Sequence, residues 1–179
     1  YTQYGQNAMA YGNYTGRQVQ AMWLTRTYLI LSSLGVDKAA MYMCKDSGPE
    51  ATTVGMYGTC GVITSDGEYK DSYYYLSTLK NRMNGMKFVG EIDSGYSDLW
   101  IYKFADENGK ICYALWCPTS DGTSYSDYSL SISGKNIKLV EMTNGQINGT
   151  ETALSAVGGS VSVNVSECPV LIIADPQDS

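Results

Sequence analysis

The chain has 179 residues, of which 44% are hydrophobic and 12% aromatic, enough for one ordinary domain or two small ones with a real core. Its net charge is −6 and it has no run of Lys or Arg, so we expect no nucleic-acid partner, which would need clustered positive charge. No stretch reaches about 18 uninterrupted apolar residues, so we also expect no membrane span.

Five cysteines and the lack of any histidine limit the possible chemistry. The cysteines show no CxxC spacing, and common zinc sites and Cys-His or Ser-His nucleophile pairs need clustered thiolates or imidazole. We therefore expect neither a metal site nor a cofactor. Cys44, Cys112 and Cys168 lie in strand-like apolar runs and are predicted to be buried thiols.

The first elements predicted along the chain are a loop, a helix and a strand. Residues 1–16 are irregular and rich in Tyr and Gly, whereas apolar residues recur at helical spacing from Arg17 onwards, and Gly35 can close the helix in a left-handed conformation. The run "DKAAMYMCKD" (37–46) follows, and its centre shows no polar alternation. This pattern predicts a strand covered on both faces, as parallel strands are.

A Gly-, Ser- and Thr-rich stretch leads into a second predicted helix, "KDSYYYLSTLKNRMNG" (70–85), which the Asn-Gly pair ends. The rest of the sequence consists of short β-rich runs separated by turn signals, at a spacing that indicates an antiparallel β-sandwich. The boundary near Met86 divides the chain into domains 1–86 and 87–179. The runs are "KFVGEI", "DLWIYKF", "KICYALWC", "NIKLVEM", "GSVSVNV" and "PVLIIAD".

A lone strand between two helices cannot satisfy its edge hydrogen bonds or bury both of its faces. Residues 1–86 are therefore predicted to close a larger parallel α/β domain whose other strands lie upstream of Tyr1. An N-terminal remainder, in the same precursor or in a second chain, is the expected partner.

Four stretches in this order carry a resemblance that covers nearly the whole chain. They are "RQVQAMWLTRTYLILSSLGVDKAAMYMCKD", "YGTCGVITSDGEYKDSYYYLSTL", "YKFADENGKICYALWCPTS" and "SVSVNVSECPVLIIAD". The chain resembles the C-terminal end of a retaining glycoside hydrolase of the large (β/α)8-barrel (TIM-barrel) clan with its appended β-sandwich. The resemblance implies that the first part supplies the seventh helix, the eighth strand and the eighth helix of the barrel.

The resemblance also implies a mechanism with two glutamates, an acid/base after the fourth strand and a nucleophile at the end of the seventh. Both would precede Tyr1, so no catalytic residue is expected in this chain. Glu50, Glu68 and Glu91 are interpreted as solvated surface carboxylates, because they lie in a loop, a turn and a sandwich strand.

The active face of such a barrel lies at the C-terminal ends of its strands, and two regions of this chain would reach it. The first is the loop before the seventh helix, where the rings of Tyr4 and Tyr11 could stack on sugars or pack on their neighbours.

The second region is the end of the eighth strand, with Tyr42, Lys45 and Asp46. Asp46 is in phase with Tyr42 on an alternating strand, and its carboxylate could accept hydrogen bonds from sugar hydroxyls or cap the turn "KDSGPE". On the sandwich, Trp100 and Trp116 could form core or a binding platform.

Two functions remain open. In the first, the chain is the C-terminal part of a glycoside hydrolase acting on a poly- or oligosaccharide. Residues 1–46 would shape one wall of the glycan cleft, and residues 87–179 would brace the barrel. In the second, it is a non-catalytic carbohydrate-binding or adhesive module. Glycan-degrading proteins are commonly secreted, periplasmic or at the cell surface, but five thiols fit a reducing setting equally well.

Overall fold

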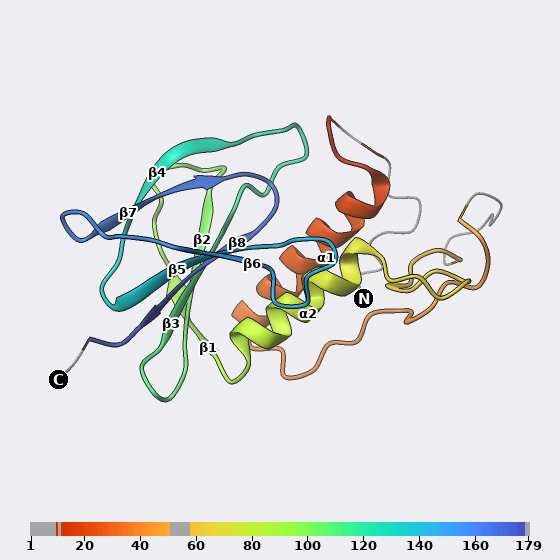
Figure 1. The fold of residues 1–179 in the computed structure, drawn as a ribbon, viewed down its shortest axis with the longest axis horizontal. Coiled ribbons are helices and arrows are strands. Elements are labelled where there is room, and N and C mark those ends of the chain that lie inside the picture. Colours follow the sequence, from red (N-terminus) through yellow and green to blue (C-terminus); the bar gives the residue numbers. More distant parts are fainter. Residues whose placement is uncertain (1–9, 11, 51–57, 178–179) are drawn as a thin grey trace. The chain divides into compact units, whose positions relative to one another are not determined.

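A computed structural model describes residues 10, 12–50 and 58–177 (Figure 1). The chain divides into two compact units, Tyr1–Arg82 with Thr143–Gly149, and Met83–Met142 with Thr150–Ser179. Over the described residues it forms two helices and eight strands. Neither of these helices combines the length and the apolar character needed to cross a membrane.

Helix α1 (Gly16–Ser33) begins with a capping box. Thr15 Oγ1 accepts the N–H of Gln18 at 3.3 Å, and Gln18 Oε1 accepts the N–H of Thr15 at 2.8 Å. Two backbone N–H groups at the start of the helix thus have side-chain acceptors. Gly35, with φ of 72°, follows the last turn in the left-handed conformation. The first predicted helix and its glycine stop are confirmed.

Helix α2 (Asp71–Met83) confirms the second predicted helix. The loop 143–149 belongs to the same unit and lies along this helix. Asn81 Nδ2 donates to the carbonyl of Ile147 at 2.9 Å, and Arg82 Nε donates to the carbonyl of Asn148 at 2.8 Å. A segment distant in sequence thus completes the first unit.

The predicted buried strand over residues 37–46 is not formed. No residue from 37 to 44 belongs to a strand, Ala39 and Ala40 are exposed, and Lys45 makes one isolated parallel bridge, to Ile63. Cys44 is exposed, so its predicted burial is also wrong. The physical reason is that a strand needs a ladder partner, and the described residues offer this segment only that single bridge.

The second unit contains two antiparallel sheets (Figure 1). The larger has the order β1-β2-β3-β8-β5-β6, and the smaller pairs β4 with β7. The strands are β1 (Lys87–Glu91), β2 (Trp100–Ala105), β3 (Ile111–Trp116), β4 (Tyr125–Ser131), β5 (Lys135–Glu141), β6 (Thr150–Ala153), β7 (Ser160–Val165) and β8 (Val170–Asp175).

Both sheets contribute to one hydrophobic core, as in a β-sandwich. In β7 the residues Val161, Val163 and Val165 are buried, and the polar residues between them face outward. Leu115 and Ile172 contribute to the same core from the larger sheet. All six predicted β-rich runs form strands, whereas β4 and β6 were not predicted.

The opposite face of the larger sheet carries an aromatic cluster. Trp116 is fully buried, and its ring centroid lies 4.8 Å from that of Tyr102 and 5.8 Å from that of Trp100. Trp116 is therefore buried, but on the face opposite the core that the two sheets share, while Trp100 is half-buried.

Replacement of Ile172 by Ala should destabilise the sandwich. The residue is fully buried in the shared core, so the cavity should lower the free energy of unfolding by about 2–5 kcal/mol, measured by denaturant titration. Val89→Ala is the control, because Val89 is 58% exposed and its truncation should change stability by less than about 0.5 kcal/mol. Equal effects of the two changes would contradict the assignment of the core.

Candidate functional site

A buried lysine organises the irregular part of the first unit. Lys70 is 1% exposed, and its Nζ lies 2.6 Å from Asp46 Oδ2 and 2.9 Å from Glu50 Oε1. The same ammonium group donates to the carbonyl oxygen of Thr59 at 3.0 Å. Two carboxylates and a carbonyl thus compensate for the loss of hydration of the ammonium group.

Asp46 is 5% exposed and is held on both carboxylate oxygens. Its Oδ1 accepts the backbone N–H of Gly61 at 2.8 Å, while Oδ2 faces Lys70. A Cβ at position 61 would lie 2.7 Å from both the backbone nitrogen and Oδ1 of Asp46, so only glycine permits this approach.

The network continues outward to the start of α1. Arg17 donates to Glu50 Oε2 from Nε at 3.0 Å and from Nη2 at 2.8 Å. Deeper in the unit, Gln20 Nε2 donates to the carbonyl of Gly61 at 3.1 Å. Helix α1 is therefore hydrogen-bonded to the segment between residues 46 and 70 at two points, Glu50 and Gly61.

The environment shifts several pKa values in this network. Partial burial tends to raise the pKa of Glu50, but hydrogen bonds from Arg17 and Lys70 and their charges outweigh it, so this pKa lies below its ordinary value. The hydrogen bond to Glu50 raises the pKa of Arg17. At the start of α2, burial raises the pKa of Asp71.

An exposed tyrosine adjoins the buried lysine. Tyr69 is 50% exposed, and its ring stacks on Tyr73 with centroids 4.1 Å apart. Tyr74 meets both rings edge-on. Tyr69 is exposed while the next residue, Lys70, is buried, because neighbouring residues in an extended segment point in opposite directions.

The structure separates the residues that the sequence grouped. Tyr42 is 47% exposed and Lys45 is exposed, but Asp46 is buried, so Asp46 and Tyr42 do not present one continuous surface. Tyr4 and Tyr11 lie outside the described residues. The sugar-binding role of all five residues stays a prediction.

Sequence reasoning missed Lys70 as the centre of the network. Glu50, interpreted as a solvated carboxylate, is instead paired with Lys70 and Arg17. A lysine before a helix gives no sequence signal that distinguishes a buried ion pair from a solvated group.

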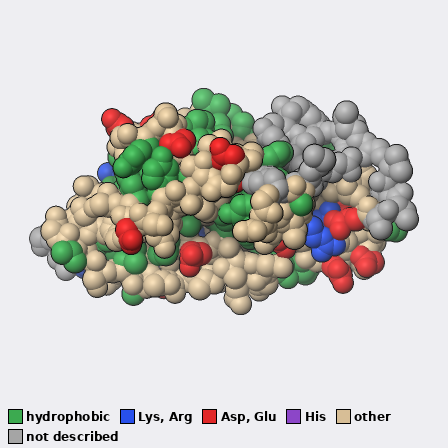
Figure 2. Space-filling view, turned by 90° about the horizontal axis from the view of Figure 1, so that it is seen from above, with side chains coloured by type: hydrophobic (Ala, Val, Ile, Leu, Met, Phe, Trp, Pro, Cys, Tyr) green, Lys and Arg blue, Asp and Glu red, His purple; other side chains and the backbone are tan. Residues whose placement is uncertain are grey.

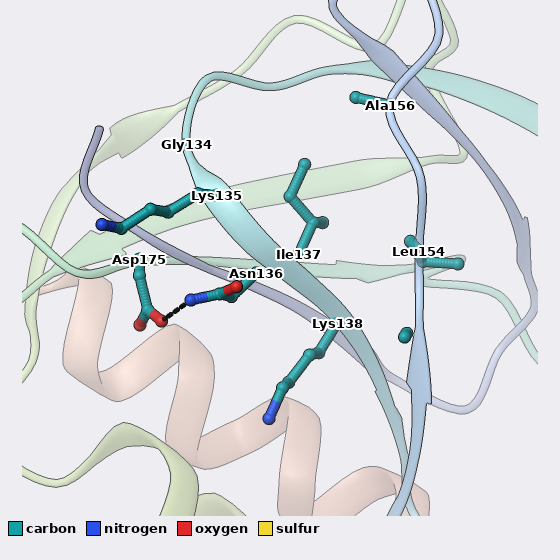
Figure 3. A pocket seen from close by; sticks show the side chains of 9 residues that line it. Gly134, Lys135, Asn136, Ile137, Lys138, Leu154, Ala156 and Asp175 are labelled. Carbon is teal, nitrogen blue, oxygen red and sulfur yellow. Dashed lines mark hydrogen bonds between the residues drawn. The ribbon is translucent and has the colours of Figure 1, made fainter. Parts of the chain in front are cut away.

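A pocket lies among the described residues of each unit. In the first unit, an open pocket of about 380 Å³ lies between α1 and residues 36–41, lined mainly by apolar side chains such as Leu24, Tyr28 and Leu31. In the second, about 510 Å³ lies beside β5, where Asn136 Nδ2 donates to Asp175 Oδ2 at 3.1 Å (Figure 3). The linings contain at most one carboxylate each, and glycoside hydrolysis generally uses two.

Charged groups are dispersed over the described residues on the face drawn in Figure 2. Figure 2 shows Asp and Glu side chains scattered among uncharged ones on the face drawn, without a continuous basic area among its described residues.

No family model matches this chain, and no curated protein matches it. Solved structures are similar to it, however. A family 39 glycoside hydrolase from the gut symbiont Bacteroides cellulosilyticus gives a TM-score of 0.70 at 18% identity, over 89% of this chain and 31% of the other. A GH30 endoxylanase from Clostridium papyrosolvens gives 0.59 at 12% identity, over 87% and 38%.

A third structure, the catalytic domain of GH30 xylanase C from Talaromyces cellulolyticus, gives a TM-score of 0.56 at 14% identity, over 95% and 37%. The chain therefore spans about a third of the length of these solved structures. At such low identity the likeness concerns the fold, which this chain shares with parts of glycoside hydrolases of families 39 and 30.

Replacement of Lys70 by Met should destabilise the first unit by about 3–5 kcal/mol, because it leaves the buried Asp46 carboxylate without its counter-charge. Thermal and denaturant unfolding measure the change. The control is Lys138→Met, which removes an ion pair with Glu151 whose side chains are 44% and 33% exposed, so the expected loss is below about 1 kcal/mol. Equal losses in the two variants would refute the buried-pair interpretation.

Glu50 should contribute stability that depends on pH. Because its pKa is lower in the folded than in the unfolded chain, this contribution is present above the unfolded value and disappears as pH falls through the folded value. The Tm advantage of the wild type over Glu50→Gln should therefore be largest at neutral pH and vanish in acid, measured between about pH 7 and pH 2. A difference that stays constant over this range would contradict the pKa assignment.

Proposed function

We propose that this chain is the C-terminal part of a retaining glycoside hydrolase that acts on a poly- or oligosaccharide. It would combine the end of a (β/α)8 barrel with an appended β-sandwich. The observation that carries the proposal is the likeness to a family 39 glycoside hydrolase, which extends over 89% of this chain at a TM-score of 0.70.

The exposed segment after α1 supports an incomplete barrel. Residues 37–40 are exposed although Ala39 and Ala40 are apolar, and the cavity between α1 and residues 36–41 has a mainly apolar lining. Strands from an N-terminal remainder of the protein would pair with this segment and cover it. That remainder is the proposed partner, and it would supply the catalytic glutamates.

In this arrangement the buried network positions one wall of the glycan cleft. Lys70 holds Asp46, the last residue of the segment proposed as the eighth strand, and thereby fixes the backbone that presents Tyr42 and Lys45 to solvent. Tyr42 and Lys45 would contact the sugar directly. Asp46 would act as a positioning residue, since its two oxygens already bind Gly61 and Lys70.

A free-standing carbohydrate-binding module is less well supported. Such a module needs only the sheets, whereas the likeness to glycoside hydrolases covers most of the chain, helices included. We place the enzyme outside the cytoplasm, secreted or at the cell surface or in the periplasm, because polymeric glycans are too large to be taken up intact.

Isolation from the native source tests the proposal. An antibody against this chain should recover either a longer polypeptide or a second chain, identified by intact mass and N-terminal sequencing. The recovered protein should release reducing sugar from xylan or a β-glucan, whereas recombinant residues 1–179 should not. Recovery of a 19.5 kDa monomer that unfolds cooperatively and binds glycans without hydrolysing them would establish the binding-module alternative instead.

A further inference from the structure

Three tyrosines form a cluster on the second unit. Tyr96 lies in the loop between β1 and β2, and Tyr125 and Tyr128 lie on β4. The ring centroid of Tyr96 is 4.7 Å from that of Tyr125 and 6.4 Å from that of Tyr128. Tyr96 is 52% exposed, whereas the two rings that support it are half-buried. We call these three residues the Tyr96 cluster.

The loop that carries Tyr96 is fixed by its own hydrogen bonds. Ser94 Oγ accepts the N–H of Tyr96 at 3.1 Å and donates to the carbonyl of Leu99 at 2.6 Å, while Asp93 Oδ1 accepts the N–H of Gly95 at 2.8 Å. These local bonds fix the backbone that carries the exposed ring, and the contacts with Tyr125 and Tyr128 support the ring itself. A preorganised side chain loses less conformational entropy on binding.

The supporting rings are also fixed. The Tyr125 hydroxyl donates to Asp98 Oδ1, and this hydrogen bond raises the pKa of Tyr125 to about 12. The Tyr128 hydroxyl donates to the carbonyl of Ser94 at 3.4 Å, and burial raises the pKa of Tyr128. Both phenols therefore remain neutral donors at physiological pH.

The chemistry of the cluster suits a neutral, hydroxyl-rich ligand. A flat aromatic face is electron-rich and attracts the weakly positive C–H groups on one face of a pyranose ring. The carboxylates of Asp93 and Asp98 lie at the margin and can accept hydrogen bonds from hydroxyl groups. The same carboxylates disfavour anionic ligands such as nucleic acid or sulfated glycans.

We propose that the Tyr96 cluster is a non-catalytic binding site for a neutral polysaccharide on the sandwich, with Tyr96 as the stacking platform. It would hold a polymer near the enzyme independently of the cleft. The choice of a polysaccharide as ligand rests on the proposed function. The observation that the Tyr96 ring is exposed and prepositioned is independent of that function.

Tyr96→Ala tests the site in the full-length protein that contains this chain. Affinity electrophoresis through gels with soluble xylan or mixed-linkage β-glucan measures polymer binding. Loss of the platform should weaken binding about three- to tenfold, the fold-change that corresponds to the usual strength of one aromatic contact. Tyr96→Phe retains the ring face and should bind within twofold of the wild type, roughly the effect of one exposed hydroxyl.

Val157→Ala is the matched control. Val157 is 82% exposed and bridges to Ser160, which pairs with Ser131 at the end of β4 remote from Tyr125. This variant should bind polymer like the wild type. All three variants should hydrolyse a short soluble oligosaccharide at the wild-type rate, because such a substrate cannot reach a second site while occupying the cleft.

Several outcomes would overturn the site. They are unchanged polymer binding by Tyr96→Ala, an equal loss in Val157→Ala, and no polymer binding by the wild type. Polymer binding abolished by about 0.5 M NaCl would also overturn the site, because stacking on a neutral sugar involves no ion pair that salt could screen. A wild type that binds polymer through Tyr96 but hydrolyses no glycan would refute the proposed function and leave the site standing.

Discussion

The first unit depends on one buried ammonium group. Lys70 bonds to Asp46, Glu50 and Thr59, which lie at three points of a long irregular segment. These bonds stabilise the segment in place of the regular backbone hydrogen bonds that it lacks. Because the group is nearly inaccessible to water, each partner is needed to offset its desolvation. Gly61 and Gln20 then connect this centre to α1.

The regular elements were predictable because their patterns are local. The capping box at Thr15 and Gln18 and the alternating valines of β7 follow directly from neighbouring residues. Strand β6 was missed because all four of its residues are exposed, and β4 because its pairing is interrupted by a bulge between Tyr125 and Tyr128. A polar or irregular strand leaves little hydrophobic periodicity to detect.

Long-range features were not predictable in the same way. The sequence indicated an apolar strand at 37–46, but a strand forms only where neighbouring strands supply its ladder, and the described residues provide a single bridge at Lys45. Likewise Tyr96 and Tyr125 are 4.7 Å apart between ring centroids although a whole hairpin separates them in sequence. The ion pairs of Lys70 and the tyrosine cluster required coordinates.

The open segment at residues 37–44 has a further consequence for handling the chain. This largely exposed stretch contains adjacent alanines and belongs to no strand, so another copy can add its own backbone to it. Natural sheets blunt exposed edges with charge or proline, but only Asp37 and Lys38 at its start do so here. Concentrated solutions of residues 1–179 would therefore tend to self-associate through this stretch, and solubility tags or dilute conditions would suit their preparation.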